Sequence, residues 1–164
     1  MTDPQQIVVI RGAINATDAL CVVASLTGDV EATVESEMIY PYYCLDADCS
    51  VPTMVGRKQL SMICLVDAVN GLGATADSFE LKKETVPNDI LLTSDIDAAE
   101  AEKIAHRTVT HRLGKKLRTI STFDVRVTPR GLIHKRFWIV KTSDARVMVD
   151  STTGSLHPLK LRAA

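Results

Sequence analysis

The pattern Val-Asp-x-x-x-Gly occurs twice in this chain, at Val66–Gly71 and at Val149–Gly154. The two copies are 83 residues apart, and the same separation relates Ile7 to Ile90, each of which opens an apolar run. A separation shared by both ends of a segment predicts an internal duplication, because an accidental match would have to occur twice. We therefore expect two related units, residues 1–82 and 83–164.

The repeated pattern has a structural interpretation. A strand that ends at the Val can be followed by a turn, in which the Asp accepts hydrogen bonds from the next backbone N–H groups. The Gly then supplies a positive φ for the chain reversal. A structural turn is favoured over a catalytic Asp at both positions.

Each half also carries signals for one helix. In the first half, Asn15–Asp18 is typical of a capping box, and Gly28 predicts the end of the helix. In the second half, Ser94–Asp97 gives a similar pattern before a helix over 98–113, which we expect to end at Gly114.

After each predicted helix the hydrophobic period changes to two, which indicates strands. The predicted strands cover 35–45 in the first half, and 123–127 and 133–141 in the second, where Pro129-Arg130-Gly131 predicts a hairpin turn. The expected fold class is α+β, with two helix-plus-antiparallel-sheet units related by a pseudo-twofold axis. Short apolar strands at the ends of the units are predicted to pair between the halves.

A helix, then antiparallel strands, then a last strand that ends in Val-Asp-x-x-x-Gly resembles the PepSY domain. The resemblance is clearer in the second half, through Ala98–Leu113, Phe123–Val127, Phe137–Val140 and the closing Val149–Gly154. In the first half it is carried by Leu65–Gly71 and the strands before it. The resemblance implies a non-catalytic module that binds or restrains another protein.

The hydrophobic pattern gives an expected location. The apolar runs at 7–10 and 62–66 are too short to cross a bilayer, so no membrane insertion is expected. The N-terminus lacks the pattern of a secretory signal, which predicts a cytoplasmic protein. The four cysteines, of which Cys21 and Cys64 are expected in the core, are then predicted to be free thiols.

Charge is distributed unevenly along the chain. Residues 1–81 hold three basic and eleven acidic side chains, a net charge of −8, whereas residues 82–164 hold sixteen basic and nine acidic ones, a net charge of +7. Opposite charges on the halves predict attraction between them or between copies of the protein. The alternative is that two solvated faces simply differ.

The basic residues of the second half suggest an interaction surface. We expect it to comprise Arg112, Lys115, Lys116, Arg118 and Arg136. Basic residues next to aromatic ones can also bind nucleic acid, but the acidic first half would repel phosphate, so nucleic acid is an unlikely partner. The simpler alternative is a solvated helix end, where cations are favourable.

Aromatic residues occupy corresponding places in the two halves and form the candidate ligand-binding set, which comprises Tyr40, Tyr42, Tyr43, Phe137 and Trp138. They are interpreted first as core residues. If one face of the sheet is uncovered, they would instead line an apolar groove.

The segment Cys44–Cys49 contains potential metal ligands, but in a strand Cys49 would point away from Cys44, Asp46 and Asp48. His106 and His111 are five residues apart and do not share a helical face. The sequence therefore predicts no metal, no cofactor and no catalytic residue. The favoured function is a binding or regulatory protein that recognises a protein partner or forms a homo-oligomer. The alternative is a small-molecule-binding protein or enzyme that uses the aromatic residues.

Overall fold

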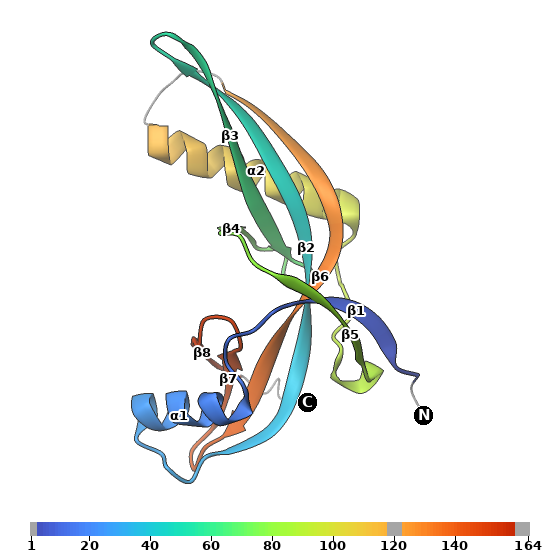
Figure 1. Cartoon of the computed structure of the whole chain (residues 1–164), viewed down its shortest axis with the longest axis vertical. Coiled ribbons are helices and arrows are strands. Elements are labelled where there is room, and N and C mark those ends of the chain that lie inside the picture. Colours follow the sequence, from blue (N-terminus) through green and yellow to red (C-terminus); the bar gives the residue numbers. More distant parts are fainter. Residues whose placement is uncertain (1–2, 118–122, 160–164) are drawn as a thin grey trace. The chain divides into compact units, whose positions relative to one another are not determined.

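The structure is a computed structural model that describes residues 3–117 and 123–159. It has the predicted α+β class, with two helices and a mostly antiparallel set of strands among these residues (Figure 1). In chain order the elements are β1 Gln5–Ile10, α1 Ala16–Thr27, β2 Thr33–Thr53, β3 Gly56–Asp67, β4 Gly73–Ala76, β5 Leu81–Val86, a 3-10 turn Asn88–Ile90, α2 Ala98–Leu117, β6 Asp124–Lys141, β7 Arg146–Asp150 and β8 Leu156–Pro158. Neither helix is both long and apolar enough to cross a membrane.

The chain forms two compact units, and each takes segments from both halves of the sequence. The described part of unit 1 comprises 3–40, 80–92 and 134–159, and that of unit 2 comprises 41–79, 93–117 and 123–133. The long strands β2 and β6 each begin in one unit and end in the other. The compact units therefore do not coincide with the predicted segments 1–82 and 83–164.

Unit 1 is built from α1 and the strands β1, β5, β7 and β8, with the first part of β2 and the last part of β6. β6 pairs antiparallel with β7, which pairs with β8, while β1 pairs antiparallel with β5. α1 packs on the sheet through Ala19 and Val23, which meet Val140 and Val149. A second small cluster joins Ile7, Val9, Ile39 and Val86.

Unit 2 is one layer of strands in the order β4-β3-β2-β6, covered on one face by α2. Alternate residues of β2, including Leu45, Ala47, Cys49 and Val51, face the helix, as period-two alternation requires. From α2 the buried residues are spaced three or four apart and are Ala101, Ile104, Ala105, Val109 and Leu113. This cluster is the larger of the two helix–sheet cores.

Both ends of α1 and the start of α2 at Ala98 agree with the sequence prediction, whereas the end of α2 does not. Asn15 caps α1 with a complete capping box, and Gly28 ends it with φ 76°. α2 continues past Gly114 to Leu117, so the predicted stop was wrong. A glycine inside a helix costs only about 1 kcal/mol, and burial of Leu113 offsets this cost. The cap is Asp97, which accepts from the Glu100 N–H at 2.8 Å, rather than Ser94.

The predicted hairpin turn at Pro129-Arg130-Gly131 is also wrong. β6 runs through these residues as one strand from Asp124 to Lys141. Gly131 has φ 110°, so the chain accommodates a local irregularity without reversing its direction. Proline and glycine together predict a turn from local preferences, but here pairing with distant strands outweighs them.

Candidate binding surfaces

The two Val-Asp-x-x-x-Gly segments form the structural turns expected from the sequence. In unit 2, Asp67 Oδ1 accepts from the N–H of Val69 at 2.8 Å and of Asn70 at 2.9 Å, and Gly71 has φ 71°. In unit 1, Asp150 Oδ1 accepts from Thr152 N–H at 2.8 Å and from its hydroxyl at 2.6 Å.

The turn at Asp150 carries an additional charge pair. The Asp150 carboxylate is 7% exposed and lies 3.1 Å from Lys135 Nζ. Burial opposes its charge, but the two hydrogen bonds from Thr152 and the cation of Lys135 together hold the pKa of Asp150 below its ordinary value. Asp150 therefore contributes to stability and is not a candidate acid or base.

The five predicted aromatic residues are divided between the two units. Tyr40 and Phe137 belong to unit 1, where their rings meet edge to face at 5.9 Å, and Trp138 lies in the same unit. Tyr42 and Tyr43 belong to unit 2.

Two of these aromatic side chains hold the start of a helix in place. The Trp138 indole N–H donates to the Ile14 carbonyl at 2.9 Å, just before α1. The Tyr43 hydroxyl donates to the Ile96 carbonyl at 2.9 Å, just before α2. Both rings also pack against the cores of their units. The core interpretation therefore describes them better than a ligand groove.

Arg136, predicted as an interaction residue, lies in a network of ion pairs within unit 1. Its side chain is 14% exposed, and it contacts Glu37 at 2.9 Å and also Glu84. Burial raises the pKa of Glu84, but the hydrogen bond and charge of Arg136 outweigh it, so the pKa lies below its ordinary value. The guanidinium is already engaged by two carboxylates.

Three of the four cysteines and the buried histidine have environments that suppress reactivity. Cys44, Cys49 and Cys64 are buried, whereas Cys21 is exposed, contrary to the expectation of a core position. Burial raises the pKa of the Cys64 thiol to about 11, which disfavours the nucleophilic thiolate. Burial lowers the pKa of His134, whose Nδ1 lies 3.2 Å from the Val8 carbonyl oxygen. The described residues contain no group of three potential metal ligands.

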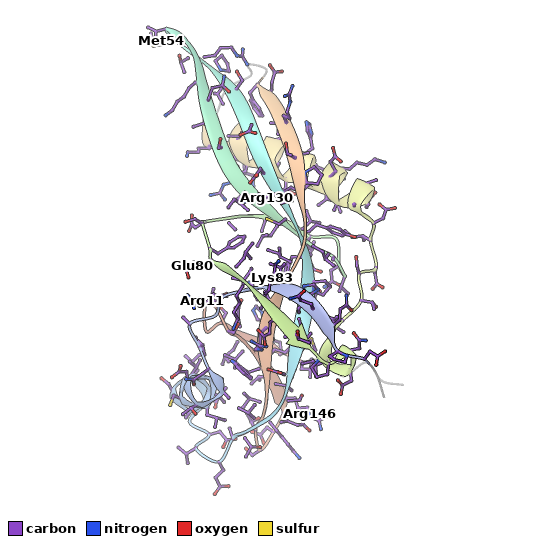
Figure 2. All side chains as sticks on the ribbon, turned by 45° about the vertical axis from the view of Figure 1, so that its right-hand side comes forward. Arg11, Met54, Glu80, Lys83, Arg130 and Arg146 are labelled. Carbon is purple, nitrogen blue, oxygen red and sulfur yellow. The ribbon has the colours of Figure 1, made fainter. Side chains whose placement is uncertain are left out.

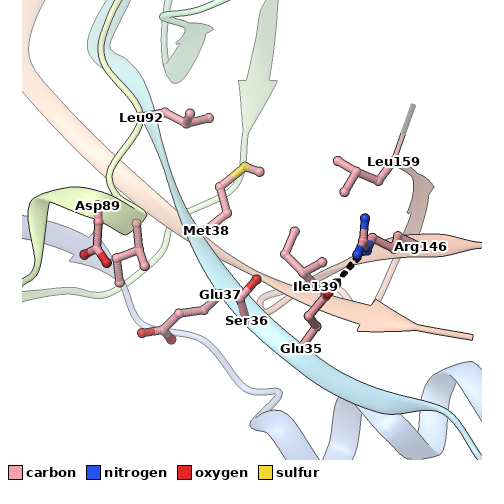
Figure 3. A pocket seen from close by; sticks show the side chains of 10 residues that line it. Glu35, Ser36, Glu37, Met38, Asp89, Leu92, Ile139, Arg146 and Leu159 are labelled. Atoms are coloured by element: carbon pink, nitrogen blue, oxygen red, sulfur yellow. Dashed lines mark hydrogen bonds and ion pairs between the residues drawn. The ribbon is translucent and has the colours of Figure 1, made fainter. Parts of the chain in front are cut away.

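Unit 1 contains an open pocket of about 280 Å³ (Figure 3). Its apolar lining comes from Met38, Ile90, Leu92, Ile139 and Leu159. At its rim Glu35 is neutralised by Arg146, whose Nε lies 2.7 Å from Glu35 Oε2. The pocket offers few polar groups that are not already paired.

Unit 2 contains a groove of about 330 Å³ beside the C-terminal end of α2. We call it the β3-edge groove, and its lining is Leu60, Ser61, Met62, Thr75, Ala76, Asp77, Arg112, Leu113 and Lys116. Two of the predicted interaction residues, Arg112 and Lys116, thus line one concave surface. Lys115 is exposed on the same helical turn, and Arg118 lies outside the described residues.

The groove exists because β4 is much shorter than β3. The pairing of β3 with β4 ends at Ile63 and Ala76, whereas β3 extends back to Gly56. From Gly56 to Met62, β3 pairs with β2 on one side and with no other strand among the described residues. Sequence reasoning missed Leu60–Met62, because this part of β3 is open only where β4 stops, and no pattern within β3 records that position. The available signal was the charged segment Asp77–Glu80 after β4.

The face of unit 2 opposite α2 is polar and internally paired. Arg130 lies 3.0 Å from Asp46, and the Ser61 hydroxyl donates to Asp48 at 2.9 Å. The β2–β3 hairpin ends in Met54 (Figure 2) and Val55. The residues are 104% and 98% exposed. The accessible features of this unit thus include a paired polar face, an apolar hairpin tip, the β3-edge groove and a pocket of about 490 Å³ lined by Ala99, Glu102, Lys103, His106 and Val127.

No family model matches the sequence, and the searches of curated proteins and of solved structures found no match to the chain.

Proposed function

We propose that this chain is a non-catalytic binding protein that recognises a protein partner through unit 2. The observation that carries this proposal is the β3-edge groove, where an unpaired strand edge lies beside Arg112 and Lys116. Strand edges present N–H and C=O groups that another polypeptide can pair with. The groups with shifted pKa values are held in turns, ion pairs or cores and none of them lines this groove, which favours binding over catalysis.

The resemblance to PepSY domains is part of the same proposal. In each unit a helix packs on antiparallel strands, and the last long pairing ends in a Val-Asp-x-x-x-Gly turn. PepSY-like modules bind other proteins without catalysing a reaction, which agrees with a role for the open strand edge. A cytoplasmic location also belongs to the proposal, supported by four cysteines without a disulfide.

We further propose that the units descend from one duplicated ancestor whose halves exchange strands. Support comes first from the closing turns. Asp67 N–H donates to Leu72 O at 2.8 Å and Asp150 N–H donates to Ser155 O at 2.9 Å, a separation of 83 residues in both donor and acceptor.

The strand register supports the same proposal. Tyr43 pairs with Val66 in unit 2, and Trp138 pairs with Val149 in unit 1. Tyr43 and Trp138 are 95 residues apart, whereas Val66 and Val149 are 83 apart. The two separations differ because the hairpin in the first half is longer. In each pair the first residue lies on a long strand that began in the other unit, shortly after the boundary between the units.

A split chain tests the exchange. We expect two fragments, cut between Ser78 and Phe79 before β5, to be largely unfolded alone and to form a one-to-one complex when mixed, because each unit needs strands from both. Light scattering and circular dichroism of the separate and mixed fragments measure this. Two fragments that each fold alone as stable monomers would contradict it.

Capture from native cell extract tests the binding function. The wild-type chain is expected to retain a stoichiometric partner that the Arg112→Glu variant loses, since the variant reverses one charge in the groove. The control is Arg107→Glu, which makes the same charge reversal at an exposed position of α2 outside the groove. This variant should retain the partner. The partner is then purified and titrated against both variants. If wild type and Arg112→Glu retain the same proteins, the groove is not the binding surface.

A further inference from the structure

We infer that the β3-edge groove binds an acidic peptide segment in extended conformation, which adds as a strand alongside Gln59–Ser61. This inference rests on the proposed binding function and specifies the chemistry of the partner. It is carried by three observations: the direction of the backbone groups on β3, the charge of the groove, and the different construction of the edges of β5 and β8.

The backbone of β3 directs unpaired groups into the groove. Asp67 N–H donates to Leu72 O at 2.8 Å, so Asp67 points its backbone groups toward the β4 side. The β2–β3 register is continuous, and in an antiparallel strand alternate residues direct N–H and C=O to the same edge. Ser61 and Gln59 therefore point these groups to the β4 side, where β4 has already ended.

Basic side chains surround this edge. Arg112 and Lys116 are one helical turn apart on α2, so both project from the same helical face into the groove. Lys58 is exposed on β3 and lies two residues before Leu60, hence on the same face of the strand. The groove contains one acidic side chain, Asp77. An incoming strand with carboxylates on its α2-facing side would pair with these cations.

Two other strand edges, those of β5 and β8 in unit 1, are protected against pairing. β5 pairs only with β1 among the described strands, and exposes Lys82 and Lys83 before Pro87. β8 is three residues long and ends in Pro158, which has no N–H to donate. The exposed positions Gln59 and Ser61 on β3 are uncharged, and neither they nor their neighbours in Gly56–Met62 include a proline.

The geometry also specifies the pattern of the peptide. Side chains of an added strand alternate between the α2 side and the polar face that carries Ser61. On the α2 side they would meet Leu60, Met62 and the basic residues, so acidic residues are expected at every second position. A nucleic acid could satisfy the charges but not the unpaired N–H and C=O groups of the strand edge.

The experiment uses the full-length protein and a fluorescein-labelled heptapeptide, Thr-Glu-Thr-Glu-Thr-Glu-Thr, followed by fluorescence anisotropy. Two further peptides carry three N-methyl groups each. In one they are on the amide nitrogens of the three Glu residues, and in the other on those of the two inner Thr residues and the C-terminal Thr, which alternate with them. Because alternate N–H groups point to opposite edges of a strand, only one methylated peptide can still pair with β3. We expect one to bind like the parent and the other to bind about tenfold more weakly.

The Arg112→Glu variant should also bind the parent peptide about tenfold more weakly, while Arg107→Glu stays within about twofold. Thermal melting by circular dichroism checks that both variants fold. Equal binding of the two methylated peptides, lost at high salt, would overturn strand addition and leave only electrostatic attraction. If the peptide does not bind but Arg112→Glu still loses the captured partner, this inference fails and the binding function stands. If neither peptide binding nor capture of the partner depends on Arg112, both this inference and the proposed binding function fail.

Discussion

Replacement of Asp150 by alanine is expected to lower the free energy of unfolding of unit 1 by about 3 kcal/mol. The carboxylate is 7% exposed and accepts from the N–H and hydroxyl of Thr152, so the variant leaves these donors unsatisfied. It also removes the ion pair between Asp150 and Lys135, whose side chain is 17% exposed. Chemical denaturation followed by the fluorescence of Trp138, the only tryptophan, measures the loss.

Asp67→Ala is the matched control, because Asp67 occupies the equivalent turn in unit 2. Asp67 is only half-buried, so its loss should cost about 1 kcal/mol, followed by circular dichroism. Equal losses at the two positions would show that the turn alone, without the Lys135 pair, determines the stability.

The effect of Asp150 should depend on pH. Its pKa is lower in the folded protein than its ordinary value, so the folded state favours the carboxylate. The stabilisation is therefore complete above the unfolded pKa of about 4 and is lost as the pH falls through the lower folded value. The difference between wild type and Asp150→Ala should shrink progressively below pH 4. A difference that stays constant down to pH 2 would contradict the charged role of Asp150.

Replacement of Arg136 by methionine is expected to destabilise unit 1 by about 2 kcal/mol. The substitution keeps the apolar stem but leaves Glu37 and Glu84, which are 31% and 26% exposed, without this cation. The value is set below that of a fully buried pair because both carboxylates are partly solvated. Thermal and urea unfolding by circular dichroism measure the change.

Arg146→Met is the control for Arg136→Met, since Arg146 pairs with Glu35 where both side chains are more than a third exposed. It should cost about 0.5 kcal/mol. Burial raises the pKa of Glu84, and in Arg136→Met only Lys82 remains to lower it, so this pKa should be higher in the variant than in the wild type. A raised folded pKa favours the protonated form, and the variant should recover stability as the pH falls to 4. Equal losses for the two arginines would contradict the buried network.

Local signals in the sequence predicted local structure well. The capping box at Asn15 and the left-handed Gly28 are satisfied within α1 itself, so short-range chemistry decides them. The Asp67 and Asp150 turns are likewise closed by hydrogen bonds that reach two or three residues. The turn predicted at Gly131 failed because distant pairing keeps β6 extended.

The candidate site was less predictable, for the same physical reason. The sequence identified Arg112 and Lys116 as interaction residues, and they do line a groove. It also grouped Arg136 with them, but Arg136 meets Glu84, 52 residues away in sequence, inside the other unit. The unpaired edge at Ser61 depends on where β4 stops, which no local pattern in β3 records.

Amide hydrogen exchange along β3, measured residue by residue by NMR, tests the open strand edge most directly. In the free protein we predict fast exchange at Gln59 and Ser61, whose N–H groups point away from β2 toward the groove. We predict slow exchange at Leu60 and Met62, whose N–H groups point toward β2. The acidic heptapeptide should slow exchange at Gln59 and Ser61 and leave Leu60 and Met62 unchanged. Protection of Gln59 and Ser61 in the free protein, or no change on adding the peptide, would contradict the β3 edge as the binding site.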